Sequence, residues 1–271
     1  DVLHIYGHRR RSRKLKQVFT LIRVHRFWFM RLWYLVTLPW WVFKRTSVWL
    51  SRDPGRGVHV HEKLILQFIA GAITASWIYT KLGPQWREIF IPFDGYINIG
   101  WLIIPLIIFF VMFTANAVNV ADGMDGLAGG SLLITFSALT LLSWLDGYQR
   151  IAVINATTVG ALIAYTFFNI KPARFQMGDV GSLGLGALLA INTIVINRML
   201  LLPLFGFIFY LELATVVIQV FGRHLLGRRI FTMAPIHHHF ELRGWSEEKT
   251  VMRFWIVHAG VVLLGLWIAL Y

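Results

Sequence analysis

The chain has 271 residues, of which 57% are hydrophobic, and its formal net charge is +13. Only 14% of the residues are charged, whereas a soluble domain carries about a quarter. There is no cysteine, which excludes thiol catalysis and cysteine-ligated metals. The composition therefore excludes an ordinary soluble domain, a disordered chain and a disulfide-stabilised scaffold.

Seven segments approach the roughly 20 mostly apolar residues that a helix needs to cross a bilayer. The fifth of them is short and rich in glycine, which allows close contact between helices. Helices satisfy their backbone polar groups internally, so the sequence predicts an all-α, polytopic membrane bundle. The segments are residues 63–81, 98–118, 127–145, 151–169, 181–197, 199–221 and 254–271.

Lysine and arginine are distributed unequally between the two sides of this predicted bundle. Residues 1–63, 119–126, 170–180 and 222–253 share one side and hold 22 of the 26 basic residues. The positive-inside rule places that side in the cytoplasm. The charge is therefore a signal of topology, and no basic soluble domain remains to bind nucleic acid.

The first 60 residues differ from the rest, because they hold 13 basic residues and two acids. A tryptophan-rich stretch at 27–50 is interrupted by charges and a proline, and the basic run before it suits anionic lipid headgroups. We predict that residues 1–56 form a cytoplasmic or interfacial insertion ahead of a catalytic core at 57–271. The chain starts at Asp1 without a methionine, which favours an N-terminally incomplete protein.

The first polar cluster comprises Asn116, Asn119, Asp122 and Asp125, at the junction of the second and third spans. A glycine follows each aspartate, so backbone N–H groups can approach a ligand closely. The start of the next helix adds a partial positive charge that suits phosphate. A plain capped turn would use the same residue types, but two Asp-Gly pairs with two asparagines favour a binding site.

The second cluster contains Asn169, Phe175 and Asp179, between the fourth and fifth spans. Taken alone, Asp179 is as well explained as a helix cap. It shares the predicted cytoplasmic face with Asp122 and Asp125, however. Carboxylates gathered there suit a Mg²⁺ ion that keeps several waters and bridges the phosphates of a substrate.

The third cluster is the triplet His237, His238 and His239, preceded by Arg228 and Arg229. Neighbouring side chains point in different directions, so the three imidazoles cannot easily bind one ion. They fit better as donors to phosphate or to a nucleotide, although a solvated basic loop is an equal alternative.

Two further polar residues, Glu212 and Gln219, fall in or near the sixth span. A charge within a span is costly and is usually functional or paired. Catalysis and a structural hydrogen bond explain Glu212 equally well. Because the three clusters lie in loops and not at the bilayer midplane, they favour transfer of a phosphoryl-linked group to a lipid over transport.

The three clusters resemble the motifs of the phospho-N-acetylmuramoyl-pentapeptide transferase (MraY) family, within the polyprenyl-phosphate N-acetylhexosamine-1-phosphate transferase superfamily. The resemblance rests on residues 116–125, 177–182 and 235–255, and the histidine triplet is its most specific part. It covers residues 57–271, whose seven spans look like the fourth to tenth of the ten in that family.

The chain departs from the family pattern at three places. Asp1 looks like the second member of an aspartate pair that ends the family's third span. Residues 9–56 replace a short loop. Gln176 stands where the family has a phenylalanine that stacks on uracil, and Phe175 precedes it.

The resemblance also implies roles for individual residues. Asp179 would bind Mg²⁺ and take part in catalysis with His237, and Asp1 would be a candidate base. The substrate-binding residues would be Asn116, Asn119, Asp122, Asp125, Asn169, Phe175, Gln219, His237, His238 and His239.

The resemblance implies a reaction and a setting as well. Donor and acceptor would be UDP-MurNAc-pentapeptide and undecaprenyl phosphate, which give lipid I and UMP in peptidoglycan synthesis. The enzyme would be a multi-pass protein of the bacterial cytoplasmic membrane, forming homodimers, with its site facing the cytoplasm. The alternatives are a HexNAc-1-phosphate transferase that acts on polyprenyl phosphate and, from another class, a non-catalytic scaffold or transporter.

Overall fold

The computed structural model describes residues 60–81 and 87–271. Residues 67–271 form one compact unit, and every contact discussed below lies within it. The predicted insertion at 1–56 and Asp1 lie outside the described residues. Their assignments stay predictions.

Seven of the described helices are long and apolar enough to cross a membrane. This confirms the predicted all-α, polytopic fold, and the chain is a multi-pass membrane protein. The helices are α4 (Val60–Lys81), α5 (Ile103–Ala121), α6 (Leu127–Leu145), α7 (Gln149–Asn169), α8 (Gly178–Val195), α10 (Phe207–Leu225) and α12 (Glu247–Leu270).

Short elements connect these helices. An antiparallel hairpin, absent from the sequence prediction, pairs β1 (Glu88–Ile91) with β2 (Gly95–Asn98) and places Glu88 opposite Asn98. The 3₁₀ turn η2 (Gly100–Leu102) leads into α5, and α11 (Ile236–Leu242) precedes α12.

Two predicted span boundaries are wrong. The sixth span is not continuous from residue 199, because η3 (Met199–Leu201) and α9 (Leu202–Phe205) precede a break at Gly206. A Cβ at Gly206 would lie 3.0 Å from the Tyr210 ring, so a larger residue would crowd this break. The last span begins at Glu247 instead of residue 254. Its first turn is polar and is capped by Ser246, so hydropathy alone does not detect it.

Close packing of α8 on α5 depends on one glycine. A Cβ at Gly186 would lie 2.7 Å from the Ala115 Cα, so the two backbones approach as small residues allow. Gly184, another glycine of the segment predicted to allow close helix contact, has nothing within 4 Å of such a Cβ. Phe136, Phe205 and Phe209 fill the core between the helices.

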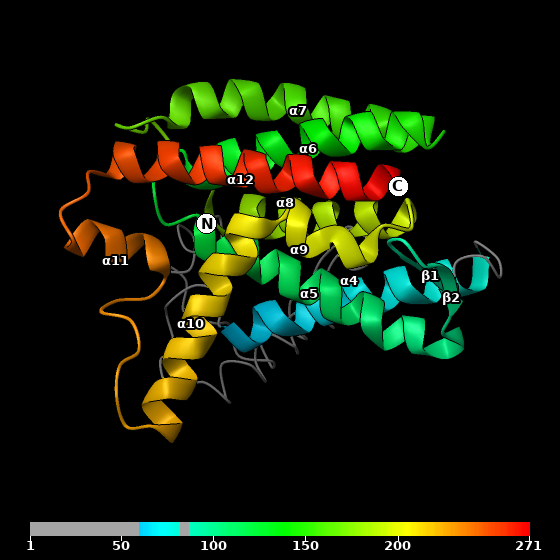
Figure 1. Cartoon of the computed structure of the whole chain (residues 1–271), viewed down its shortest axis with the longest axis horizontal. Helices are drawn as coiled ribbons and strands as arrows, with labels where there is room; N and C mark the ends of the chain where they lie inside the picture. Colours follow the sequence, from blue (N-terminus) through cyan, green and yellow to red (C-terminus); the bar gives the residue numbers. More distant parts are fainter. Residues whose placement is uncertain (1–59, 82–86) are drawn as a thin grey trace, which may run out of the picture. The chain divides into compact units, whose positions relative to one another are not determined.

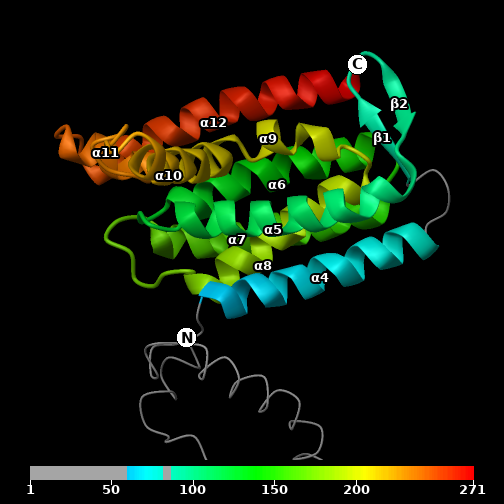
Figure 2. The same cartoon turned by 90° about the horizontal axis from the view of Figure 1, so that it is seen from below.

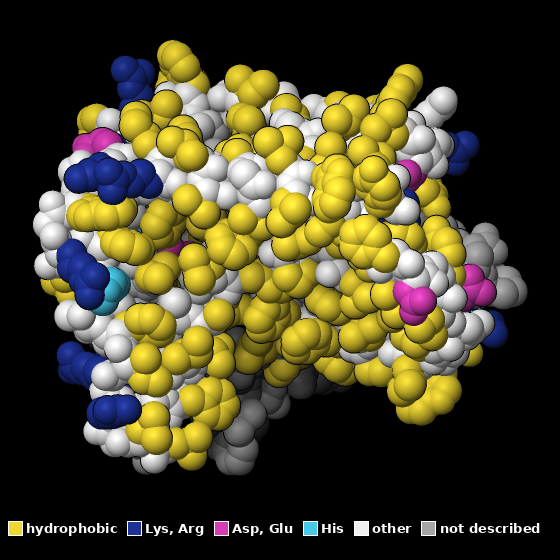
Figure 3. All heavy atoms as spheres, viewed as in Figure 1, with side chains coloured by type: hydrophobic (Ala, Val, Ile, Leu, Met, Phe, Trp, Pro, Cys, Tyr) yellow, Lys and Arg dark blue, Asp and Glu magenta, His cyan; other side chains and the backbone are white. Residues whose placement is uncertain are grey.

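The long helices run side by side, and their two ends differ (Figure 1). Figure 2 shows α11 at one end, and the hairpin and the C-terminus at the other. On the face in Figure 3, hydrophobic side chains cover the middle, and lysine and arginine gather mainly at the end that carries α11. We call this end the polar end, since all three predicted clusters lie there.

Candidate functional site

A tight loop at residues 122–126 joins α5 to α6 at the polar end. Asp122 follows the last residue of α5, and its N–H donates to the Asn119 carbonyl. Gly126 has a φ of 85°, a backbone conformation that favours glycine, and it precedes the first turn of α6. The loop therefore projects two carboxylates from a short and constrained backbone.

Asn119 connects this region to the start of α8. Its amide nitrogen donates to Asp179 Oδ1 and to Ser182 Oγ, each at 2.9 Å. Asp179 occupies the first turn of α8, where the helix dipole favours a negative charge. The first and second predicted clusters thus meet at Asp179.

The pKa of Asp122 reflects the charges around it. Burial raises its pKa to about 6, although the Gly178 N–H at the start of α8 donates to it and opposes that shift. The negative charges of Asp179 and Asp125 raise the pKa further. Acids that repel one another here would be stabilised by a cation.

The donor set fits Mg²⁺ better than a fully protein-ligated metal. Among the described residues, no group of three or more His, Cys, Asp or Glu side chains could hold a metal ion. Mg²⁺ usually takes only one or two carboxylates, keeps waters and uses substrate phosphates as further ligands. Asp179, with Asp122 beside it, meets that requirement with oxygen donors alone.

Asn169 joins two loops with both ends of its amide. Its oxygen accepts from the Gly126 N–H at 2.9 Å, and its nitrogen donates to the Phe175 carbonyl at 3.0 Å. Asp125 Oδ2 accepts from the Ala173 N–H at 3.0 Å. Asn169 is 3% exposed, so it joins the two loops from a buried position.

Glu247 and Lys171, which the sequence prediction missed, add two contacts to this network. We call the network of Asn169, Asp125, Glu247 and Lys171 the clasp. Glu247 accepts from the Asp125 N–H at 2.9 Å and lies 2.6 Å from Lys171 Nζ. This hydrogen bond raises the pKa of Lys171. The sequence signal was present, since Ser246 caps α12 and two glutamates follow it.

Phe175 exposes about half of its side chain, 49%. Its ring lies 5.5 Å from Tyr165 and 6.0 Å from Phe168, between ring centroids. The ring thus belongs to an aromatic cluster and stays half exposed. Its use as a stacking platform for uracil stays a prediction.

The histidine triplet occupies α11, and its members have different surroundings. His237 is buried against Glu212, with 3.0 Å between Nδ1 and Oε2. His238 Nδ1 lies 2.6 Å from Glu241 Oε2 and is partly exposed, whereas the His239 ring faces Phe231. The His237 and His238 rings lie 4.2 Å apart between centroids, but each faces a different carboxylate. His238 is the more exposed of these two.

The structure brings two predicted residues to other neighbours. Asn116 Nδ2 donates to Gln67 Oε1 at 2.6 Å, so this side chain faces α4 and not Asp179. Gln219 holds the segment after α10, because its oxygen accepts from the Ile230 and Phe231 N–H groups and its nitrogen donates to the Phe231 carbonyl.

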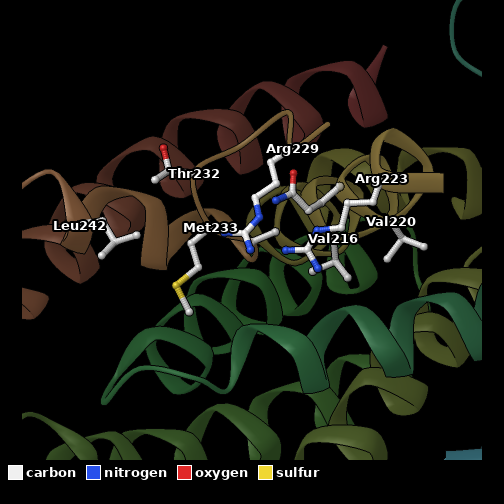
Figure 4. Close-up of a pocket in the computed structure, with 9 residues that line it drawn as sticks. Val216, Val220, Arg223, Arg229, Thr232, Met233 and Leu242 are labelled. Carbon is white, nitrogen blue, oxygen red and sulfur yellow. The ribbon is translucent and has the colours of Figure 1, made fainter. Parts of the chain in front are cut away.

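A cavity of about 590 Å³ adjoins Gln219, between α10 and the segment that follows it. Figure 4 shows Arg223 and Arg229 along it, together with apolar side chains such as Val216 and Met233. Apolar walls with two guanidinium groups suit an amphiphile that carries a negative charge.

The sequence of the chain is similar to those of known proteins. The family model of glycosyl transferase family 4 matches residues 52–197. A phospho-N-acetylmuramoyl-pentapeptide-transferase of Levilactobacillus brevis is 38% identical over 83% of this chain and 69% of its own length. A protein of the same name from Lacticaseibacillus paracasei is 37% identical over 82% of this chain and 68% of its own length.

A third relative with this name, from Desulforamulus reducens, is 38% identical over 78% of this chain and 64% of its own length. The three relatives share one name, and each matches more than three quarters of this chain. The chain therefore belongs to glycosyl transferase family 4 and, within it, to the phospho-N-acetylmuramoyl-pentapeptide-transferases.

Proposed function

We propose that this protein transfers phospho-MurNAc-pentapeptide from UDP-MurNAc-pentapeptide to undecaprenyl phosphate, giving lipid I and UMP. The net reaction forms a bond between an acceptor phosphate oxygen and the phosphorus that carries the sugar. The bond from that phosphorus to the oxygen of UMP breaks. The observation that carries the proposal is the contact of Asn119 with Asp179, beside Asp122, at one end of a membrane bundle.

The residues of the polar end would have different roles in the transfer. Asp179 would hold Mg²⁺, and the ion would supply positive charge to the diphosphate. Asn119 orients the Asp179 carboxylate by donating to its Oδ1. Asp122 and Asp125 lie on one loop, where the first predicted cluster would meet the uridine side of the donor. His238 lies partly exposed next to Glu241 and would contact the donor phosphates.

The location of these residues also supports the proposal over a transporter. They lie at helix ends and in loops, whereas a transporter places its binding residues near the bilayer midplane. The lysine and arginine distribution supports a polar end that faces the cytoplasm of a bacterial cell. A soluble nucleotide donor would reach it there, and the lipid acceptor would arrive within the bilayer.

The test is release of UMP by the full-length protein in nanodiscs, with undecaprenyl phosphate as acceptor. UDP-MurNAc-pentapeptide and UDP-GlcNAc are offered separately, with Mg²⁺ and with EDTA. We expect Mg²⁺-dependent UMP release and a lipid-linked product from the first donor alone. Release from UDP-GlcNAc instead would support the HexNAc-1-phosphate transferase, and no release from either donor would contradict both.

A further inference from the structure

An acid and an imidazole face each other inside the bundle. Glu212 of α10 and His237 of α11 have side chains that are 0% and 1% exposed, and 3.0 Å separates Oε2 from Nδ1. A lone charge buried in this way is strongly unfavourable, so loss of either partner would leave the other unpaired in a dry environment. Glu212 therefore needs His237 as its partner, and the reverse is equally true.

The other edge of the imidazole touches the loop at residues 122–126. A Cβ added to Gly123 would lie 2.9 Å from His237 Nε2 and 3.1 Å from Cε1. Within the described part of the chain, Nε2 is buried and has no hydrogen-bond partner. The ring is therefore wedged between Glu212 and the backbone next to Asp122.

The contact between Glu212 and His237 is close but is not aligned as a hydrogen bond. Neither carboxylate oxygen has an aligned hydrogen bond to another described residue, although Nδ1 is within contact distance. Coulomb attraction is strong in such a dry environment. A neutral amide of the same shape would fill the space but would hold the ring less firmly.

We propose that Glu212 is a positioning residue, which holds the His237 ring against Gly123 and so places the Asp122 carboxylate at the start of α8. This inference rests on the proposed function, because it assigns Glu212 a part in the same transfer. Glu212 touches no substrate and acts through His237. Asp122 is next to Gly123, so a shift of the ring would move the Asp122 side chain.

The experiment compares Glu212→Gln, His237→Gln and the double variant in the full-length protein, in nanodiscs with both substrates. Glu212→Gln should lower kcat about tenfold and change the donor KM less than about threefold. Because Glu212 acts through His237, the double variant should be no slower than His237→Gln alone. Glu212→Asp keeps the charge and should recover most of the lost kcat.

Thr215→Ser is the matched control, since Thr215 is also buried in α10 and its hydroxyl donates to the Glu212 backbone carbonyl at 2.8 Å, a bond that serine keeps. It should keep the wild-type kcat. Thermal unfolding of each variant separates loss of fold from loss of positioning. If Glu212→Gln does not fold, Gly123→Ala replaces it, because the new methyl group displaces the ring and should lower kcat as well.

Three results would overturn the inference: a wild-type kcat in Glu212→Gln, losses that multiply in the double variant, or an effect on KM alone. In the second arm, a wild-type kcat in Gly123→Ala would do the same. Failure of the wild-type protein to release UMP is distinguishable from these, since it contradicts the proposed function itself.

Discussion

The partly buried acids Asp146 and Asp122, at opposite ends of the bundle, have charged neighbours of opposite sign. At the end with the hairpin, Asp146 Oδ2 lies 3.1 Å from an Arg198 nitrogen, and the same guanidinium stacks 4.0 Å from the Phe90 ring centroid. Burial raises the pKa of Asp146, and Arg198 opposes the shift. At the polar end, the nearby charges raise the pKa of Asp122 because they are also acids.

The sign of the neighbouring charges distinguishes a structural ion pair at Asp146 from a candidate cation-binding site at Asp122. Arg198, just before η3, joins the end of α6 through Asp146 and the hairpin through Phe90, so this pair has a structural role. The acids around Asp122 repel one another and are held in place by neutral amides and backbone N–H groups. A membrane protein that keeps such acids together gains from a cation or a cationic complex at that point.

The largest effect is expected where the polar end would lose its metal-binding acid. Asp179→Asn keeps the shape and the contact with Asn119, but removes the charge that would hold Mg²⁺. We expect kcat/KM to fall by about a thousandfold or more, with unchanged membrane insertion and little change in thermal unfolding. UMP release at several Mg²⁺ concentrations measures this, and near-normal rates would rule out the metal assignment.

A smaller effect is expected at the clasp that supports the polar end. Glu247→Gln weakens the contact with Lys171 and the hydrogen bond from the Asp125 N–H, so the loop at residues 122–126 is less well placed. We expect kcat/KM to fall about tenfold, because small displacements of binding groups cost rate. Glu248→Gln is the matched control, since its carboxylate is half exposed and lies 3.7 Å from Lys171. Equal losses in both variants would show that the clasp has no special role.

Sequence alone predicted the fold class, the number of spans and the gathering of the polar clusters at one end. Hydropathy could do this because α5 to α8 are apolar along most of their length. It could not see the break at Gly206, which lies within an apolar run, nor the polar start of α12. The partner of Glu212 was also hidden, because His237 follows 25 residues later and only the fold brings them together.

The smallest effect on activity is expected at the opposite end of the bundle. Asp146→Asn leaves the Arg198 guanidinium, whose side chain is 11% exposed, without its carboxylate. A charge left unpaired in this way costs about 1–3 kcal/mol of stability, so thermal unfolding should shift downward while kcat stays within about twofold of the wild type. Adding Arg198→Met should recover part of the stability, because it removes the unpaired charge and keeps an apolar contact with Phe90. A kcat that fell in step with stability would mean that the two ends are coupled, and that the contrast between a structural pair and a reactive cluster does not hold.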